Sequence, residues 1–179
     1  NQNHEFISGF LRSKRSQYLP TLGKNIEGHS RLEEQRLFLK DFINICEEEQ
    51  ADIIIIAGDI YDKSVPSAEA VTIFDEFLTE LSEITPAIPI LIISGNHDSP
   101  DRLNYASEIL RRHHIYLVGN VPEQPEEHIE KVTLQDKYGE VDFYLLPFMK
   151  PGYVRNVFVN NVPETYADAV REIIKREEI

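Results

Sequence analysis

Two short stretches decide the fold of this chain: IIIIAGDIYD, from Ile53 to Asp62, and PILIISGNHD, from Pro89 to Asp98. In each stretch an apolar run ends in a polar turn that contains a glycine. Short, wholly apolar runs are typical of strands that are buried on both faces, as in parallel sheets. We therefore expect two buried strands, 53–57 and 89–93, each followed directly by polar side chains.

Helices are expected on both sides of these strands. Ser30 and Glu33 predict a capping box at the start of a first helix. Ser67 is suited to cap a second helix, and Ser99 with Pro100 to start a third. The residues expected to face the core are Leu32, Leu39, Ile43 and Cys46 in the first helix, Val71, Phe74, Leu78 and Leu81 in the second, and Leu103, Ala106 and Leu110 in the third.

A third strand is expected at 115–118, followed by a surface connection at 119–128. Strands that alternate with helices indicate right-handed crossovers and an α/β fold with a largely parallel sheet. Further on, 129–135 and 141–147 predict a hairpin. Thr165 and Asp168 predict the cap of a last helix. Its expected inner stripe is Tyr166, Ala169, Ile173 and Ile174.

Length and composition indicate one globular domain. The chain has 179 residues and 20.7 kDa, with 41% hydrophobic and 27% charged residues. We see no apolar run long enough to span a membrane and no apolar segment typical of a signal peptide. Cys46 is the single cysteine, so a reducing, cytoplasmic setting is expected. Cys46 itself is expected to be a small buried hydrophobe.

The net charge argues against a protein that coats nucleic acid by itself. Lys and Arg number 18 and Asp and Glu 31, a formal net charge of −13. An acidic surface repels phosphate. A site that reaches phosphate through bound cations remains compatible with this charge, because such ions invert the local field.

The polar turns after the two strands are the candidate site. In open parallel sheets, ligands bind beyond the carboxyl ends of the strands. There Asp59 offers a carboxylate that could bridge two cations, and Asn96 offers an amide oxygen, a set suited to manganese or magnesium. The plain alternatives are a turn or helix cap for Asp59 and Asp62, and a hydrogen-bonded surface histidine for His97.

Gly58-Asp-x-x-Asp62 followed by Gly95-Asn-His-Asp98 resembles the motifs of the calcineurin-like metallophosphoesterases. Flanking segments, among them SRLEEQ from Ser30 and SGNHDSPDRL from Ser94, are similar to the SbcD group of bacterial DNA nucleases. The resemblance covers about Leu22 to Pro151. It implies the family's sandwich of two sheets flanked by helices, present here as a partial domain at 23–179 without its C-terminal part.

By this resemblance Asp59 is the metal-bridging carboxylate and Asn96 a ligand of one ion. His97 faces the scissile phosphate, and Asp62 orients that histidine. The resemblance further implies two manganese ions per site, an SbcC-type ATPase as partner, double-stranded DNA ends or hairpins as substrate, and a homodimer. The implied activity is exonuclease and endonuclease cleavage in DNA repair, recombination and replication.

The chain departs from the family at its beginning. Leu19-Pro20-Thr21 stands where the family has Asp-x-His, so residues 1–22 are expected to form an atypical arm. The family's further histidine motifs are also absent. We therefore expect one manganese ion or none, and impaired activity.

Several alternatives remain open at this point. The sequence is either partial and altered at its start or a degenerate homologue. As to function, the alternatives to a nuclease are a non-catalytic partner-binding homologue and a phosphoesterase for a small substrate. Arg102 is expected to contact DNA phosphate, or else to be a plain exposed arginine at a helix start or to pair with Asp101.

Overall fold

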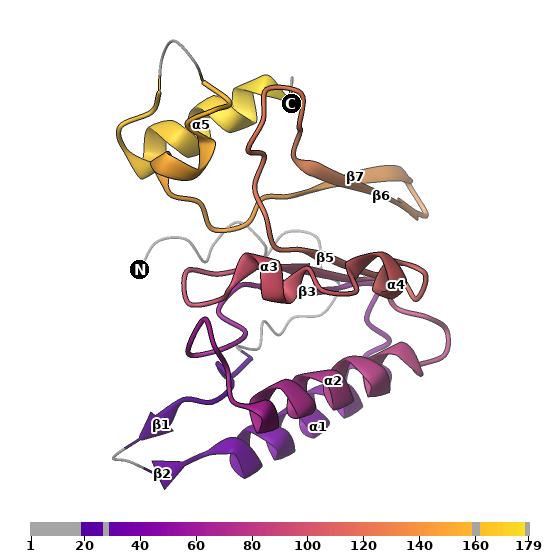
Figure 1. The fold of residues 1–179 in the computed structure, drawn as a ribbon. Coiled ribbons are helices and arrows are strands. Elements are labelled where there is room, and N and C mark those ends of the chain that lie inside the picture. Colours follow the sequence, from indigo (N-terminus) through magenta and orange to yellow (C-terminus); the bar gives the residue numbers. More distant parts are fainter. Residues whose placement is uncertain (1–18, 27–28, 159–161, 178–179) are drawn as a thin grey trace.

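The computed structural model describes residues 19–26, 29–158 and 162–177 of the chain. These residues form three layers, in which a pair of helices covers one face of a sheet and a hairpin covers the other (Figure 1). This confirms the predicted α/β fold. The elements in chain order are β1 (Asn25–Ile26), β2 (His29–Ser30), α1 (Leu32–Glu48), β3 (Ile54–Ala57), α2 (Ala68–Ser82), β4 (Ile90–Ile93), α3 (Pro100–Leu103), α4 (Ser107–Arg111), β5 (Ile115–Val118), β6 (Glu130–Asp136), β7 (Gly139–Leu145), the 3-10 helix η1 (Pro151–Val154) and α5 (Tyr166–Arg176).

The central sheet is parallel, with the strand order β3-β4-β5. Ile54 lies beside Ile90, and Ile90 beside Ile115, so the three strands start in register. Each of the first two strands begins one residue later than expected, because Ile53 and Pro89 precede the paired backbone. The carboxyl ends of β3 and β4 are therefore adjacent, at Ala57 and Ile93.

The main core lies between the sheet and helices α1 and α2. It confirms the predicted buried positions Leu39, Ile43 and Cys46 of α1. Burial, and secondarily the charge of Glu47, raises the pKa of the Cys46 thiol to about 11. The thiol is therefore protonated and unreactive at neutral pH, as expected of a core residue.

The predicted capping box of α1 is wrong. Ser30 belongs to β2, so the helix starts later, at Leu32, with Arg31 as its N-cap residue. Arg31 makes no side-chain cap hydrogen bond and instead pairs with Glu34 one turn into the helix. The strand pairing of β2 thus overrides the local capping signal.

Helix α2 starts as predicted, since the Ser67 hydroxyl accepts a hydrogen bond from the Ala70 amide at 3.2 Å. Phe74, Leu78 and Leu81 are buried as expected. Val71 is not, with 44% of its surface exposed. The buried face is instead completed by three neighbours on the inner side of the helix, which are Ala70, Ile73 and Phe77.

The predicted third helix is interrupted. It forms as two short helices, α3 and α4, because Ala106 between them has a left-handed backbone with φ of 62°. Just before the break, the Asn104 side chain accepts a hydrogen bond from the Gly119 amide at 2.8 Å. Leu103 is buried, while Ala106 and Leu110 are half-buried. Both short helices pack at the β5 edge of the sheet.

The hairpin β6–β7 confirms the predicted pair of strands, with shifted bounds. Its turn is held by Asp136, whose carboxylate accepts hydrogen bonds from the Tyr138 amide at 2.6 Å and the Gly139 amide at 2.9 Å. Val132 and Leu145 pack with Leu91 on the sheet face that α1 and α2 leave open. The hairpin therefore closes the second side of the sheet.

The cap of α5 is confirmed, because the Thr165 hydroxyl accepts a hydrogen bond from the Asp168 amide at 3.1 Å. Ala169 and Ile173 are fully buried, in a small cluster with Val154 of η1. Tyr166 and Ile174 are exposed, contrary to expectation. The cluster that contains Val154 therefore covers only the narrow stripe of α5 formed by Ala169 and Ile173.

Within the described residues, none of the helices combines the length and apolar character that crossing a bilayer requires.

Candidate functional site

Two turns meet at the carboxyl edge of the sheet, one after β3 and one after β4. They pack so closely that only glycine fits at their contact. A Cβ atom added to Gly58 would lie 2.7 Å from the Gly95 Cα, and one added to Gly95 would lie 2.2 Å from both the amide nitrogen and Oδ1 of Asp59. The two glycines therefore allow the turns to touch.

Asp59 lies directly at this contact. Its backbone is left-handed, with φ of 52°, a conformation that costs a non-glycine residue on the order of 1 kcal/mol. Its Oδ1 accepts a hydrogen bond from the His97 amide at 3.3 Å. The carboxylate from the first turn is thus placed against the second turn, where Asn96 also lies.

Asp98 joins the two turns through hydrogen bonds of its carboxylate. Its carboxylate is buried, with 6% exposed, and accepts hydrogen bonds from the amides of Gly95 at 2.8 Å, Tyr61 at 2.9 Å and Ile60 at 3.2 Å. Sequence reasoning placed Asp98 at this edge but assigned it no role. The sequence shows only that an acidic residue ends the second motif. Its partners Ile60 and Tyr61 lie 38 and 37 residues away, so no neighbouring residue indicates them.

Tyr61 is buried beside this carboxylate. Burial, and then the charges of Asp98 and Asp75, raises the pKa of its hydroxyl to about 12. Its ring packs edge-on against Phe74 of α2, with 5.7 Å between the ring centres. Tyr61 therefore anchors the first turn in the main core.

His97 is exposed at the edge, and its Nδ1 lies 3.1 Å from the main-chain oxygen of Asp62. The resemblance implied that Asp62 orients this ring, and we expected its carboxylate to do so, but the contact comes from the backbone. Because a carbonyl oxygen only accepts hydrogen bonds, Nδ1 carries the proton in this contact. The second ring nitrogen, Nε2, is then left for a ligand.

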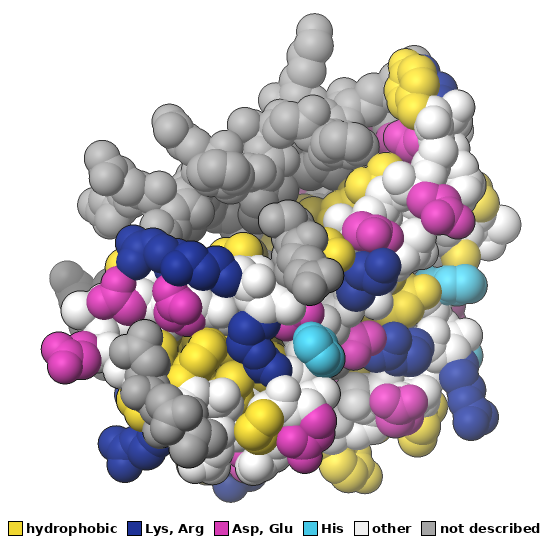
Figure 2. All heavy atoms as spheres, turned by 90° about the horizontal axis from the view of Figure 1, so that it is seen from above, with side chains coloured by type: hydrophobic (Ala, Val, Ile, Leu, Met, Phe, Trp, Pro, Cys, Tyr) yellow, Lys and Arg dark blue, Asp and Glu magenta, His cyan; other side chains and the backbone are white. Residues whose placement is uncertain are grey.

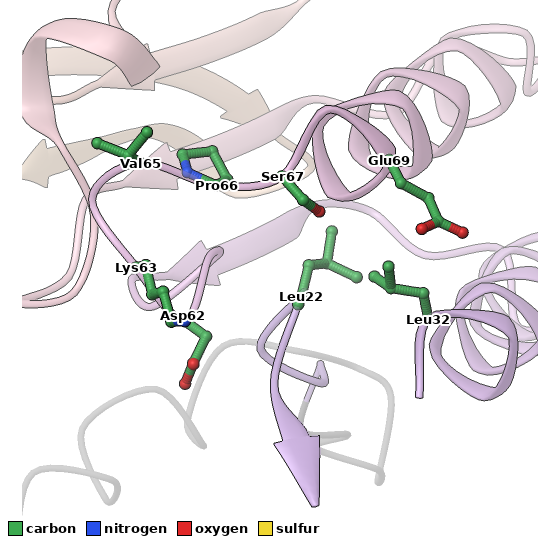
Figure 3. A pocket seen from close by; sticks show the side chains of 9 residues that line it. Leu22, Leu32, Asp62, Lys63, Val65, Pro66, Ser67 and Glu69 are labelled. Carbon is green, nitrogen blue, oxygen red and sulfur yellow. The ribbon is translucent and has the colours of Figure 1, made fainter. Parts of the chain in front are cut away.

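The Asp62 side chain lines a neighbouring cavity of about 390 Å³. Figure 3 shows Asp62 and Lys63 on one side of this cavity, Glu69 and Leu32 on the other, and Leu22 between them.

The segment that departs from the family motif runs beside the first turn. Leu22 forms a parallel bridge with Tyr61, in which its amide donates to the Ile60 oxygen at 2.8 Å and its oxygen accepts from the Asp62 amide at 2.9 Å. Leu22 is 3% exposed and belongs to the main core. Most of the predicted arm 1–22 lies outside the described residues, but its last residue is part of the packed domain.

Gln35 of α1 fixes this segment. Its side chain donates to the Thr21 oxygen at 2.8 Å and accepts from the Gly23 amide at 3.2 Å. Leu19 packs partly buried against the main core. Leucine has no atom that binds a metal ion, so Leu19 adds no ligand to the edge.

Two oxygen-bearing side chains that could hold a hard cation lie in the turns at this edge. Asp59 offers carboxylate oxygens and Asn96 an amide oxygen, and magnesium or manganese is commonly held by one or two protein oxygens, with water at the other positions. Among the residues that the structure describes, no group of three or more His, Cys, Asp and Glu side chains is placed to hold a metal ion. Within the described residues, Asp59 and Asn96 thus remain the two candidate ligands that the sequence analysis named.

The surface that Figure 2 presents carries mixed charge. Figure 2 shows Lys and Arg side chains dispersed among Asp and Glu on the face that it presents, without a continuous basic strip over the described residues. Arg102 is exposed, and Asp101 accepts a hydrogen bond from Asn120 at 3.3 Å. The described residues show no ion pair between Arg102 and Asp101, so Arg102 is an exposed arginine at the start of α3.

Comparison with known protein families finds a match to the family described as calcineurin-like phosphoesterase, over residues 29–172. The matched segment contains both turns of the candidate site.

Two curated relatives are both named as the SbcD component of the nuclease SbcCD. The one from Staphylococcus epidermidis is 37% identical over 155 residues, and the one from Staphylococcus saprophyticus is 33% identical over 153 residues. The alignments cover 87% and 86% of this chain, but 39% and 38% of the relatives. The chain thus spans less than two-fifths of the length of the curated relatives that it matches.

Proposed function

The chain belongs to the calcineurin-like phosphoesterase family, and on this premise we propose that it is a metal-dependent phosphodiesterase module of the SbcD nuclease type. The proposed substrate is double-stranded DNA at ends or hairpins, and the proposed metal is manganese. An SbcC-type ATPase as partner, a homodimeric assembly, a role in DNA repair and recombination, and a cytoplasmic setting belong to the same proposal.

The observation that carries the proposal is the meeting of the two turns. Asp59 from the first turn accepts a hydrogen bond from the His97 amide in the second, so the proposed ligand and the proposed catalytic histidine share one edge. We assign Asp59 and Asn96 to hold the cation. A divalent cation bound there would neutralise charge on the phosphodiester.

His97 is assigned to the proton on the leaving oxygen. The main-chain oxygen of Asp62 keeps the proton on Nδ1, so the ring approaches the substrate with Nε2. Protonated at Nε2, the ring can donate a hydrogen bond to the ester oxygen as the bond to phosphorus breaks. Arg102, five residues further along the chain, is assigned to the DNA phosphates on either side of the scissile one.

Metal binding is the first test. Titration calorimetry with Mn²⁺ should show weak binding of at most one ion per chain, because Asp59 and Asn96 are the two ligands that we assign. Asp59→Asn should remove this binding, while Asp101→Asn, a matched change of an exposed carboxylate near the edge, should leave it intact. Two tight sites per chain would contradict the proposal, since they require ligands that the described edge lacks.

Cleavage is the second test. Purified protein should cut linear duplex DNA only slowly in Mn²⁺, because one ion replaces the two that the family resemblance implies. His97→Ala should abolish the slow cleavage without changing Mn²⁺ binding, and His113→Ala, an exposed histidine at the end of α4, should change neither. Rapid cleavage by the unmodified chain would show that the absent ligands matter less than we propose.

A second candidate is a non-catalytic module that binds partners. The observation that favours it is the small donor set, because no cluster of three metal-binding side chains forms among the described residues. Absence of Mn²⁺ binding in the titration would select this alternative.

A further inference from the structure

One carboxylate connects the two turns that carry the proposed site, and it belongs to Asp98. We propose that Asp98 is the positioning residue that sets how closely the turn that carries Asp59 approaches the turn that carries Asn96. This inference rests on the proposed function, because it concerns the metal ligands. It goes further in assigning their placement to a residue that contacts neither the metal nor the substrate.

The bonds of Asp98 flank the proposed ligands along the chain. In the second turn, the Gly95 amide donates to Oδ2 immediately before Asn96. In the first turn, the Ile60 amide donates to Oδ2 and the Tyr61 amide to Oδ1, immediately after Asp59. A single rigid group thus holds the backbone next to each ligand.

The remaining bonds between the turns are weaker restraints. They are the contacts of His97 with Asp59 and with Asp62, at 3.3 and 3.1 Å, and both involve an exposed residue. Asp98 is buried, so water cannot replace its oxygens when they are lost. The left-handed backbone of Asp59 and its close approach to Gly95 therefore depend mainly on this carboxylate.

The chemistry of the donors calls for a carboxylate. Three amide N–H groups point at two oxygen atoms, and an ionised carboxylate only accepts hydrogen bonds. In Asp98→Asn one oxygen becomes an NH₂ group, which faces at least one backbone N–H without an acceptor. The variant keeps the size of the side chain while it releases part of the connection between the turns.

Ser94 provides the matched control. It lies at the same end of β4, is 1% exposed, and donates a hydrogen bond from its hydroxyl to the Gly119 oxygen at 2.7 Å. This bond fastens the second turn toward β5 and makes no contact with the first turn. Ser94→Ala therefore removes a buried polar contact of similar kind without removing a hydrogen bond between the two turns.

The experiment measures Mn²⁺ affinity and amide hydrogen exchange in the unmodified chain, Asp98→Asn, Asp98→Glu and Ser94→Ala. Exchange is followed by NMR in metal-free protein, at Gly95, Ile60 and Tyr61. In Asp98→Asn we expect at least about tenfold weaker Mn²⁺ binding and faster exchange at these three amides. In Ser94→Ala we expect unchanged Mn²⁺ affinity, whatever its effect on thermal stability.

Asp98→Glu covers the case in which Asp98→Asn does not fold. Glutamate keeps both oxygens but adds one methylene group, so it should retain part of the amide protection and still weaken Mn²⁺ binding by shifting the turns. Unchanged Mn²⁺ affinity in either folded variant would overturn the inference. Absence of Mn²⁺ binding by the unmodified chain would instead overturn the proposed function, and unchanged exchange in Asp98→Asn would then refute the connection itself.

Discussion

At the scale of single residues, the contact between the two turns at the edge of the sheet depends on two glycines. Gly58 and Gly95 carry no Cβ, and this lets the two turns approach within contact of each other and of the Asp59 carboxylate. The turn that carries Asp59 can touch the turn that carries Asn96 only because a Cβ atom is absent at both glycines.

Gly95→Ala should therefore destabilise the protein and displace Asp59. The added methyl group would meet Asp59 at 2.2 Å, and overpacking of this kind costs about 1–3 kcal/mol of unfolding free energy. Urea denaturation measures the loss. Gly152→Ala is the control, because a Cβ there meets no atom within 4 Å, and it should change stability by less than about 0.5 kcal/mol. Equal stability of the two variants would refute the close contact.

Tyr61 gives the edge a dependence on alkaline pH. Its pKa is about 12 in the folded chain, against an ordinary value of 10.0, because burial and the nearby carboxylates disfavour the ionised form. A pKa raised by folding contributes stability that is complete below the unfolded pKa and is lost as the pH rises through the folded one. The contribution of Tyr61 should thus disappear between about pH 10 and 12, and a shift of this size corresponds to roughly 2–3 kcal/mol.

Urea denaturation at pH 9 and at pH 11.5 tests this in paired variants. Tyr61→Phe should lose less stability over this interval than the unmodified chain, because phenylalanine does not ionise. Tyr138→Phe, which changes a tyrosine that is 84% exposed, should follow the unmodified chain. Cys46 titrates in all three proteins and cancels from the comparison. Parallel curves for Tyr61→Phe and the unmodified chain would contradict the assignment.

At the scale of elements, the last turn of α5 holds the connection that leads into the hairpin. The Glu177 carboxylate, with 6% of its side chain exposed, accepts a hydrogen bond from the Ile129 amide at 3.1 Å and lies 3.2 Å from Nδ1 of His128. Arg176 donates to the main-chain oxygens of Pro125 and Glu127 at 2.5 and 3.1 Å. The end of one helix thus orders a segment about 50 residues earlier in the chain.

Glu177→Ala should accordingly loosen this connection while the parallel sheet stays intact. We expect faster hydrogen exchange at the Ile129 amide and unchanged exchange at Ile92, in the centre of β4. Glu172→Ala serves as the control, because Glu172 pairs with Lys175 on the surface of the same helix and makes no bond to the connection. Similar protection of Ile129 in both variants would show that the bond to Glu177 contributes little.

At the scale of the whole molecule, the sheet joins two unequal cores. The larger one lies under the sheet with α1 and α2, and it includes Leu22. On the opposite face, Val132 and Leu145 of the hairpin form a smaller cluster with Leu91 of the sheet. A separate cluster, which includes Val154 and Val157, lies against α5 and contains no residue of the parallel sheet. The candidate site lies at the carboxyl edge of the strands that both layers share, so its geometry depends on the sheet that the two layers cover.

Much of this arrangement could be predicted from the sequence, because the signals are local. The apolar runs at β3 and β4 and the caps at Ser67 and Thr165 each depend on residues within a few positions of one another. The same is true of the turns that carry Asp59 and Asn96, which follow their strands directly. The site residues and their roles remain predictions that the metal and cleavage experiments test.

The residues of the chain were therefore enough to predict the α/β class, the strands and the edge at which the polar turns gather. The packing of distant segments placed Asp98 between the turns and the Asp62 backbone against His97, and neither contact could be predicted from the sequence. The physical reason is distance along the chain. The bonds of Asp98 to Ile60 and Tyr61 span 38 and 37 residues, and such partners are chosen by how the layers pack rather than by any neighbouring residue.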